Sequence, residues 1–198
     1  MTPRASLAKA PDLTMIIDTR EQVHTAYDFA PLGVPSIRRK LDAGDYGIEG
    51  YPLWAVERKE INDAANTFLT KNGRKRFVKE LERARSLEYF AILIEANVRD
   101  ILAYKPYNVK GLTRAQIDAR GKQILHSCLG WQIDYGIFVL FVDKDRDLCR
   151  AMVLRLAQRY VKSKKLEALG VVKPCERRKA RALDVGAGEQ ETMFGGAA

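Results

Sequence analysis

The chain has 198 residues and carries 34 lysines and arginines against 25 aspartates and glutamates, giving a formal net charge of +9. Hydrophobic residues make up 46% of it and charged residues 30%, which is enough apolar side chain to bury a core and excludes a wholly disordered or collagen-like chain. No uncharged apolar run reaches the roughly 18 residues that a membrane-spanning helix requires. The positive charge is typical of proteins that bind a polyanion such as nucleic acid, although many proteins are basic without such a partner.

The cysteines favour an intracellular protein. Cys128, Cys149 and Cys175 are odd in number and none of them forms a CxxC pair, so the pattern supports neither a disulfide framework nor a cysteine-based zinc site. Residues 1–13 contain no apolar segment, which argues against a secretory signal. We expect a reducing compartment (cytoplasm or nucleoid, or the nucleus if the source is eukaryotic) and no membrane partner.

Composition divides the chain into three parts. Residues 1–12 are small and polar with two prolines and predict a flexible leader. Apolar periodicity continues from residue 13 to about residue 165, which predicts one folded domain. Residues 166–198 are first rich in Lys and Arg and then in Gly, so we expect a flexible tail that either contacts phosphates or keeps the protein soluble.

The first elements in chain order are predicted strands. The apolar run 13–17 ends at Asp18 and is typical of a buried strand. A second strand is expected at 36–41, and a turn at Ala43-Gly44 leads into a third at 45–48. Another turn precedes a strand at 53–59. Such closely spaced strands predict hairpin pairing.

Two helices and a strand are expected next. Asn62 is a candidate N-cap of a short helix, and Gly73 precedes a longer helix that ends near Leu87. The run 89–94 then predicts a strand.

The last third of the domain predicts two helices around one strand. Thr113 to Gln116 have the capping-box pattern and start a helix with an apolar stripe of Ile117, Ile124, Leu125, Cys128 and Leu129. Residues 137–142 are apolar without a break, which predicts a central strand buried on both faces. The final helix has apolar residues at intervals of four, namely Leu148, Met152, Leu156 and Tyr160. These elements predict an α/β domain with a mixed sheet, and the two stripes either pack on that sheet or form an interface with another subunit.

Acidic side chains gather at the predicted strand ends: Asp18, Glu21, Asp45 and Glu57. The period of two along a strand places Glu57 and Lys59 on one face and Arg58 on the other. Carboxylate oxygens of this kind suit Mg²⁺ or Mn²⁺, and a neighbouring lysine could hold a water or neutralise charge on a phosphate. The alternative is that Glu-Arg-Lys is a solvated surface run and Gly44-Asp45 an ordinary turn. Charge spacing leaves both interpretations open.

Five short motifs follow one another along this part of the chain: Ile16-Ile17-Asp18-Thr19-Arg20-Glu21, Gly44-Asp45-Tyr46, Val56-Glu57-Arg58-Lys59-Glu60-Ile61-Asn62-Asp63, Asn72-Gly73-Arg74, and the run from Ile92 to Glu95. In this order they resemble the nuclease domain of the XPF/MUS81 (ERCC4-type) family of structure-specific DNA endonucleases, whose signature is Glu-Arg-Lys-x-x-x-Asp. The resemblance covers about residues 13–165.

The resemblance implies a restriction-endonuclease-like, PD-(D/E)XK-type fold and Mg²⁺- or Mn²⁺-dependent cleavage of DNA. It implies that Asp45 and Glu57 bind the metal, with the backbone carbonyl of Arg58, and that Lys59 is the catalytic lysine. Asp18 and Glu21 would add negative charge or orient water. Asp63 would either hold Arg58 or Lys59 in place or be an ordinary acid in the first turn of a helix. Cations that contact DNA or form networks would be Arg20, Arg58, Arg74, Lys75 and Arg76.

The chain also departs from the family pattern. Val78 stands where the family usually has a glutamine, and no tandem helix-hairpin-helix module follows the predicted domain. We expect an endonuclease that acts on branched or flap-like DNA in repair, recombination or phage DNA metabolism, as a homodimer or with an unknown partner subunit. A junction resolvase, a general DNA nuclease, and a non-catalytic DNA-binding or scaffolding subunit are the alternatives, and the intact Asp45, Glu57, Arg58 and Lys59 set argues against the last.

Overall fold

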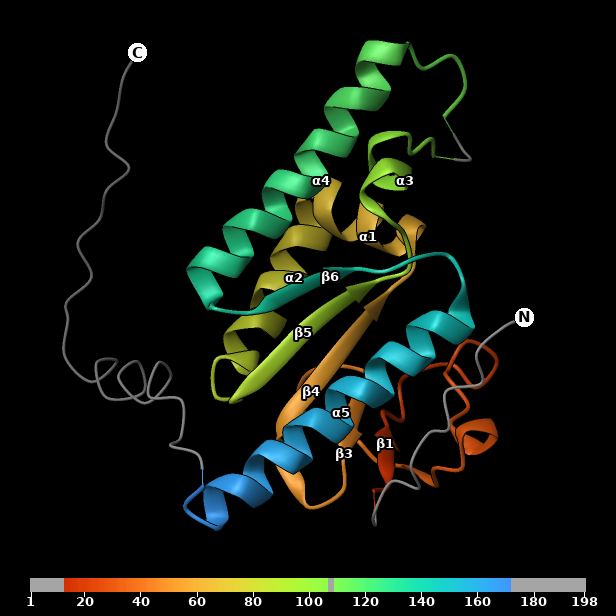
Figure 1. Cartoon of the computed structure of the whole chain (residues 1–198). Helices are drawn as coiled ribbons and strands as arrows, with labels where there is room; N and C mark the ends of the chain where they lie inside the picture. Colours follow the sequence, from red (N-terminus) through yellow and green to blue (C-terminus); the bar gives the residue numbers. More distant parts are fainter. Residues whose placement is uncertain (1–12, 107–108, 172–198) are drawn as a thin grey trace, which may run out of the picture.

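The structure is a computed structural model that describes residues 13–106 and 109–171. These residues form a sheet with helices on both faces (Figure 1). The strands are β1 (Met15–Ile17), β2 (Ser36–Arg38), β3 (Tyr46–Ile48), β4 (Tyr51–Lys59), β5 (Tyr89–Ile94) and β6 (Phe138–Phe141). The helices are α1 (Ile61–Leu69), α2 (Lys71–Ala84), α3 (Val98–Leu102), α4 (Arg114–Tyr135) and α5 (Arg146–Ala168), with a 3-10 turn at Ala30–Leu32. The predicted leader and most of the predicted tail lie outside the described residues.

The sheet is mixed, with the strand order β2-β1-β3-β4-β5-β6. Strand β3 pairs antiparallel with both β1 and β4, whereas the β1–β2, β4–β5 and β5–β6 pairs are parallel. The β3–β4 hairpin turns at Gly50, whose φ of 79° favours glycine. Helices connect β4 to β5 and β5 to β6, as parallel pairing requires. The prediction of an α/β domain with a mixed sheet and later crossover helices is therefore confirmed, as is the β3–β4 hairpin. The predicted hairpin pairing is wrong for β2, which pairs parallel to β1.

The sheet separates two hydrophobic cores, because neighbouring side chains on a strand point to opposite faces. On one face, Ile92 and Ile94 of β5 pack with Phe68 of α1, Leu81 of α2 and Ile124 of α4. The other face is covered by α5 (Figure 1), and its buried side chains include Val56, Leu93, Cys149, Val153 and Ala157. In the described ranges, no helix is long and apolar enough to cross a membrane.

Helices α1 and α2 begin earlier than predicted because other residues cap them. Glu60 caps α1, and its Oε2 accepts a hydrogen bond of 2.8 Å from the backbone N–H of Asn62, which lies inside the first turn. Thr70 caps α2, and its Oγ1 accepts a bond of 3.1 Å from the N–H of Gly73. Gly73 is thus a buried helical residue. A Cβ at Gly73 would lie 2.5 Å from the carbonyl oxygen of Asn66, so the glycine permits the close contact of α1 with α2.

The prediction that residues 137–142 form a central strand is wrong. Strand β6 lies at the edge of the sheet, pairs with β5, and leaves 46% of the Phe138 side chain exposed. An unbroken apolar run is typical of a strand buried on both faces, but here it belongs to an edge strand that lies between helices.

The predicted apolar stripe of the last helix is correct in part: Leu156 and Tyr160 pack against the core, but Leu148 and Met152 do not. Helix α5 buries Cys149, Val153 and Ala157, while Leu148 and Met152 are exposed by 47% and 36%. Both series have four-residue spacing and differ by one position, so the spacing alone could not choose between them. In α4, Leu129 likewise lies outside the buried set at 56% exposure.

Candidate active site

The residues predicted to carry the chemistry converge where β3 and β4 meet. Asp45 immediately precedes β3, and its backbone N–H donates a bond of 2.9 Å to the carbonyl of Val56 on β4. Its carbonyl accepts a bond of 2.8 Å from the N–H of Asp18 at the end of β1. Gly44 has a φ of 82°, and a Cβ there would lie 3.1 Å from the Val56 carbonyl oxygen. The glycine therefore lets Asp45 approach β4 closely.

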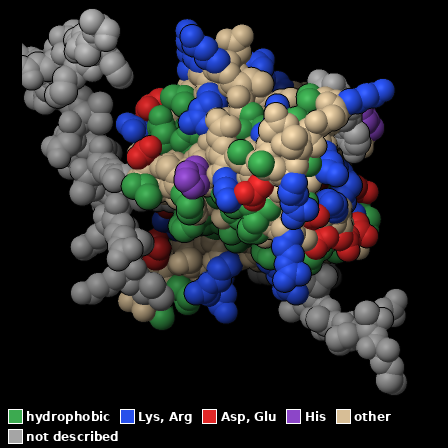
Figure 2. Space-filling view, turned by 90° about the horizontal axis from the view of Figure 1, so that it is seen from above, with side chains coloured by type: hydrophobic (Ala, Val, Ile, Leu, Met, Phe, Trp, Pro, Cys, Tyr) green, Lys and Arg blue, Asp and Glu red, His purple; other side chains and the backbone are tan. Residues whose placement is uncertain are grey.

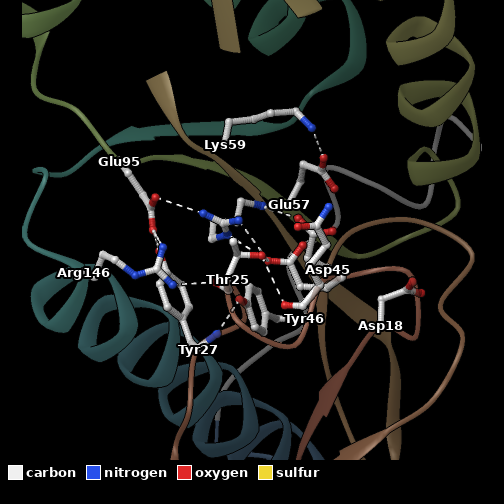
Figure 3. Close-up of polar contacts among 12 residues, drawn as sticks. Asp18, Thr25, Tyr27, Asp45, Tyr46, Glu57, Lys59, Glu95 and Arg146 are labelled. Atoms are coloured by element: carbon white, nitrogen blue, oxygen red, sulfur yellow. Dashed lines mark hydrogen bonds and ion pairs between the residues drawn. The ribbon is translucent and has the colours of Figure 1, made fainter. Parts of the chain in front are cut away.

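The end of β4 presents its three consecutive charged residues on two faces of the sheet. Glu57 and Lys59 lie on the same face, where the Lys59 ammonium donates to Glu57 Oε1 (Figure 3). Arg58 points to the opposite face, toward Tyr27 and Glu95. The predicted alternation along this strand is confirmed.

Asp45 and Glu57 are acids whose ionised form is disfavoured. Burial raises the pKa of Asp45 to about 6, against the opposing effects of the Arg58 N–H and the Lys59 charge. The N–H of Arg58 donates to Asp45 Oδ2 at 2.8 Å. Burial, followed by the charge of Asp45, raises the pKa of Glu57 well above its usual range. A bound cation would relieve both penalties, because it favours the ionised form of each carboxylate.

Lys59 is charged and held in place. Burial opposes its charge, but the carboxylates of Glu57 and Asp45 outweigh burial and raise the pKa of Lys59 above its usual value. The ammonium nitrogen also lies 5.2 Å from the centre of the Phe77 ring of α2. A positive group is thus fixed beside the two carboxylates.

Arg58 is part of a buried ion-pair network. Its guanidinium pairs with Glu21 at 3.0 Å on one side and with Glu95 at 3.0 Å on the other. Burial disfavours the charge, but the two carboxylates outweigh it and raise the pKa of Arg58. In this arrangement Arg58 contacts acidic side chains of the domain itself and brings Glu21 into the neighbourhood of Asp45, whose pKa the Glu21 charge helps to raise.

Asp18 holds the loop that follows β1. Its Oδ1 accepts a bond of 2.7 Å from Arg20 Nε, and its Oδ2 accepts one of 2.6 Å from the N–H of Leu41. The side chain is buried, and this burial is outweighed by Arg20 and the N–H donors, which lower the pKa of Asp18. Figure 3 shows its carboxylate turned away from Glu57 and Lys59. Asp18 and Arg20 therefore lie together beside the Asp45 backbone, with their charges paired.

The remaining predicted site residues lie on α1 and α2. Asp63 is exposed in the first turn of α1, and within residues 13–106 and 109–171 it has no hydrogen bond or ion pair with Arg58 or Lys59. Arg74 is partly buried: it donates to Phe68 O at 3.1 Å and to Ser127 Oγ, and its guanidinium lies 5.4 Å from the centre of the Trp131 ring. Arg74 thus joins α1, α2 and α4.

Lys75 and Arg76 lie on the solvent side of α2. With Asn72 and Lys79 they line a hollow of about 440 Å³. Both side chains are exposed. This part of α2 is therefore strongly basic. Figure 2, which views the molecule from above, shows Lys and Arg side chains scattered among Asp, Glu and hydrophobic side chains.

Three residues of the site were not among the predicted site residues. Glu80 of α2 accepts a bond of 3.2 Å from the N–H of Gly44, and its charge acts on Asp45, Glu57 and Lys59. Glu95 follows β5 and Tyr27 lies in the loop after β1. For Glu95 a signal exists, since an acid at the end of a fully apolar strand needs a buried partner. Glu80 and Tyr27 have no comparable signal in the sequence.

The oxygen donors fit a hard divalent cation. Asp45 and Glu57 supply carboxylates, and the resemblance adds the backbone carbonyl of Arg58. No group of three or more His, Cys, Asp or Glu side chains in the described part of the chain is arranged as a metal site. Mg²⁺ usually keeps several waters and is held by one or two carboxylates, so a pair of carboxylates is a donor set that could hold it.

A second hollow lies at the ends of the parallel strands. It has a volume of about 500 Å³ and is lined by residues that include Glu60, Asn62, Glu95, Tyr104, Lys144 and Arg146. Arg146 connects it to the buried network, because it pairs with Glu95 at 3.4 Å.

Comparison with known proteins identifies a family and similar folds. The ERCC4 domain family matches residues 17–153. The structure is similar to XPF from Aeropyrum pernix in complex with DNA, with a TM-score of 0.54 and 21% identity over 76% of this chain and 66% of that one. It is also similar to XPF from Aeropyrum pernix, with a TM-score of 0.51 and 23% identity over 85% of this chain and 78% of that one. These two likenesses show a shared fold, the restriction-endonuclease-like fold expected from the sequence.

The chain spans about two thirds of the DNA-bound XPF chain. No curated protein matches it. The family match covers most of the folded part and includes the Asp45, Glu57 and Lys59 positions. The chain therefore belongs to the ERCC4 domain family.

Proposed function

We propose that the chain is a DNA endonuclease that hydrolyses phosphodiester bonds with Mg²⁺, or Mn²⁺, as cofactor. The observation that carries this proposal is the arrangement of two carboxylates, the partly buried Asp45 and the buried Glu57, with the Lys59 ammonium held beside Glu57. Family membership supports the nuclease assignment, since the ERCC4 domain is a nuclease domain.

Asp45 and Glu57 would hold the metal, with the carbonyl of Arg58. The metal would polarise a phosphoryl oxygen and lower the pKa of a bound water. Metal binding and the ion pair with Lys59 compete for the oxygens of Glu57. The ammonium released from this pair can orient a water or neutralise the charge that grows on the phosphate.

The substrate we propose is branched or flap-like DNA, cut in repair, recombination or phage DNA metabolism. The basic surface of α2, formed by Lys75, Arg76 and Lys79, supports binding to a polyanion. A net charge of +9 does the same. One similar structure is an XPF in complex with DNA. A homodimer or a second subunit would extend the DNA-contacting surface, and the exposed Leu148 and Met152 of α5 are candidate contacts.

The test is a cleavage assay with Mg²⁺ on labelled flap, fork, Holliday-junction and plain duplex DNA. We expect the wild type to cut and the variants Asp45→Asn and Lys59→Ala to be inactive while still binding DNA. Lys122→Ala is the matched control, because Lys122 forms an exposed ion pair with Asp118 on α4. Cleavage that survives both site substitutions would refute the site, and binding without any cleavage by the wild type would favour a scaffolding subunit. Preferential cutting of junctions or equal cutting of plain duplex would point to a resolvase or a general nuclease.

A further inference from the structure

A set of five side chains lies on the α5 side of the sheet, behind the candidate metal ligands; Arg58 and Glu95 are buried, and Arg146 is 44% exposed. We name it the Arg58 cluster; its members are Glu21, Tyr27, Arg58, Glu95 and Arg146. Figure 3 labels Tyr27, Glu95 and Arg146 of this set. They come from the loop after β1, from the ends of β4 and β5, and from the start of α5. Elements far apart in the sequence thus meet around one guanidinium.

The Arg58 side chain has two carboxylate partners and is almost completely buried. Its side chain is 7% exposed. Nε and Nη2 lie 3.1 and 3.0 Å from Glu21 Oε1, and Nη1 lies 3.0 Å from Glu95 Oε2. The guanidinium is therefore stretched between two acids, and each of them fixes one end of it.

Glu95 is itself fixed by neighbours that do not belong to the metal site. Its Oε1 accepts a bond of 2.6 Å from the hydroxyl of Tyr27, and Arg146 lies 3.4 Å from the same oxygen. Tyr27 stacks on Tyr46, with ring centres 5.1 Å apart, and its N–H donates to the Tyr46 hydroxyl at 2.9 Å. The carboxylate is thus a rigid anchor on the β5 side.

The position of Arg58 matters to Asp45 through the backbone. The backbone N–H of Arg58 donates to Asp45 Oδ2, so a displaced Arg58 displaces a donor to that carboxylate. The period of two along β4 already places the guanidinium on the α5 side. Its ion pairs therefore fix the residue at the end of the strand, and with it the N–H that orients Asp45.

We propose that Glu95, anchored by Tyr27, is a positioning residue for metal binding: it fixes Arg58, whose backbone N–H donates to Asp45 Oδ2, and so keeps the Asp45 carboxylate in place for the cation. This inference rests on the proposed function, because it takes Asp45 and Glu57 as the metal ligands. It assigns to Glu95 a role that acts through Arg58 and involves no contact with DNA or metal.

The test measures Mn²⁺ binding to the full chain by calorimetry, with Glu95→Gln, Glu95→Asp and Tyr27→Phe. We expect both Glu95 variants to bind Mn²⁺ about tenfold more weakly, which is the usual scale for residues behind metal ligands. Glu95→Asp keeps the charge but shortens the reach, so it separates position from charge. Tyr27→Phe keeps every charge, and the loss of one hydrogen bond should weaken binding about threefold.

A second measurement reads Arg58 directly. The Nε–H of a guanidinium held between two carboxylates should give a protected NMR signal, which Arg58→Lys would assign. We expect that signal in the wild type and its loss in both Glu95 variants, with no metal present. Glu88→Gln is the matched control, because Glu88 also accepts from a tyrosine hydroxyl and pairs with a lysine, but far from Asp45 on the α5 contact with β5.

The outcomes separate the two claims. Wild-type Mn²⁺ binding that does not need Asp45 and Glu57 would refute the proposed function, and the inference with it. Wild-type binding that needs them, together with normal binding by Glu95→Asp or by both Glu95 variants, would refute the positioning role alone. If the Glu95 variants fail to fold, Tyr27→Phe decides: unchanged Mn²⁺ affinity and an unchanged Arg58 signal would overturn the inference.

Discussion

The substitution Asp45→Asn should make the metal-free protein more stable at neutral pH. Burial raises the pKa of Asp45 from 3.8 to about 6, so the folded protein takes up a proton that the unfolded chain has already lost. Stability therefore falls as pH rises from about 4 to about 6 and stays lower above that window. The asparagine keeps the shape, and its amide oxygen can still accept from the N–H of Arg58, but it carries no charge.

The size of the effect follows from that shift. A rise of about two pKa units corresponds to about 3 kcal/mol, at 1.36 kcal/mol per unit. Lys59 and Glu57 readjust when the charge of Asp45 is removed, so the observed gain should be about 1–3 kcal/mol. For a domain of this size, each kcal/mol raises Tm by about 2–4 °C.

The assay is urea and thermal unfolding in EDTA at pH 4 and at pH 7.5, followed by circular dichroism. We expect Asp45→Asn to match the wild type at pH 4 and to exceed it at pH 7.5. Asp42→Asn is the control, because Asp42 is exposed and its replacement should change stability by no more than about 0.5 kcal/mol. A variant that is no more stable than the wild type at pH 7.5, or that gains more at pH 4, would show that Asp45 is not a penalised buried carboxylate.

Three further predictions test other parts of the structure. In thermal shift measurements at pH 7.5, Mg²⁺ at 100 times its Kd should stabilise the wild type by about 2.7 kcal/mol and leave Asp45→Asn unchanged; equal shifts would place the ion elsewhere. Gly73→Ala should lower the free energy of unfolding in urea by about 1–3 kcal/mol, because its Cβ would lie 2.5 Å from Asn66 O. Helix propensity alone predicts a gain of about 1 kcal/mol, so a variant more stable than the wild type would contradict the close contact. Lys75→Ala and Arg76→Ala should each lower the slope of log K against log salt for DNA binding by about 1, whereas Arg74→Met should lower stability by about 1–3 kcal/mol and leave the slope unchanged. A slope that changes for Arg74→Met would mean that its guanidinium reaches a phosphate.

The sequence predicted what depends on local pattern. The strand at 89–94 was found because a short apolar run with no break is typical of a strand buried on both faces, and the period of two placed Glu57 and Lys59 together. The helix starts were missed because Glu60 and Thr70 compete with Asn62 and Gly73 as caps, and only the folded backbone shows which side chain reaches the free N–H groups. The edge position of β6 depends on strand order, which no local pattern records.

Long-range contacts in the site were not accessible to sequence reasoning. Arg74 occurs in a motif that suggested contact with DNA, yet its guanidinium packs on Trp131, which lies more than 50 positions further along the chain. Helix α2 brings Glu80 to the backbone of Gly44, and the loop after β1 brings Tyr27 to Tyr46. Their roles depend on tertiary distances that sequence spacing does not encode.

The two faces of strand β4 carry different sets of charged side chains. Glu57 and Lys59 lie on the side of α2, while Arg58 lies on the α5 side with Tyr27 and Glu95. The backbone N–H of Arg58 donates to Asp45, so the backbone of the strand connects the two sides. A deletion or insertion of one residue in β4 would reverse the face to which each following side chain points. The Arg58 guanidinium would then lie on the side of the candidate site, and the Glu57 carboxylate on the α5 side. Changes of length in this strand should therefore be far more damaging than any single side-chain replacement on it.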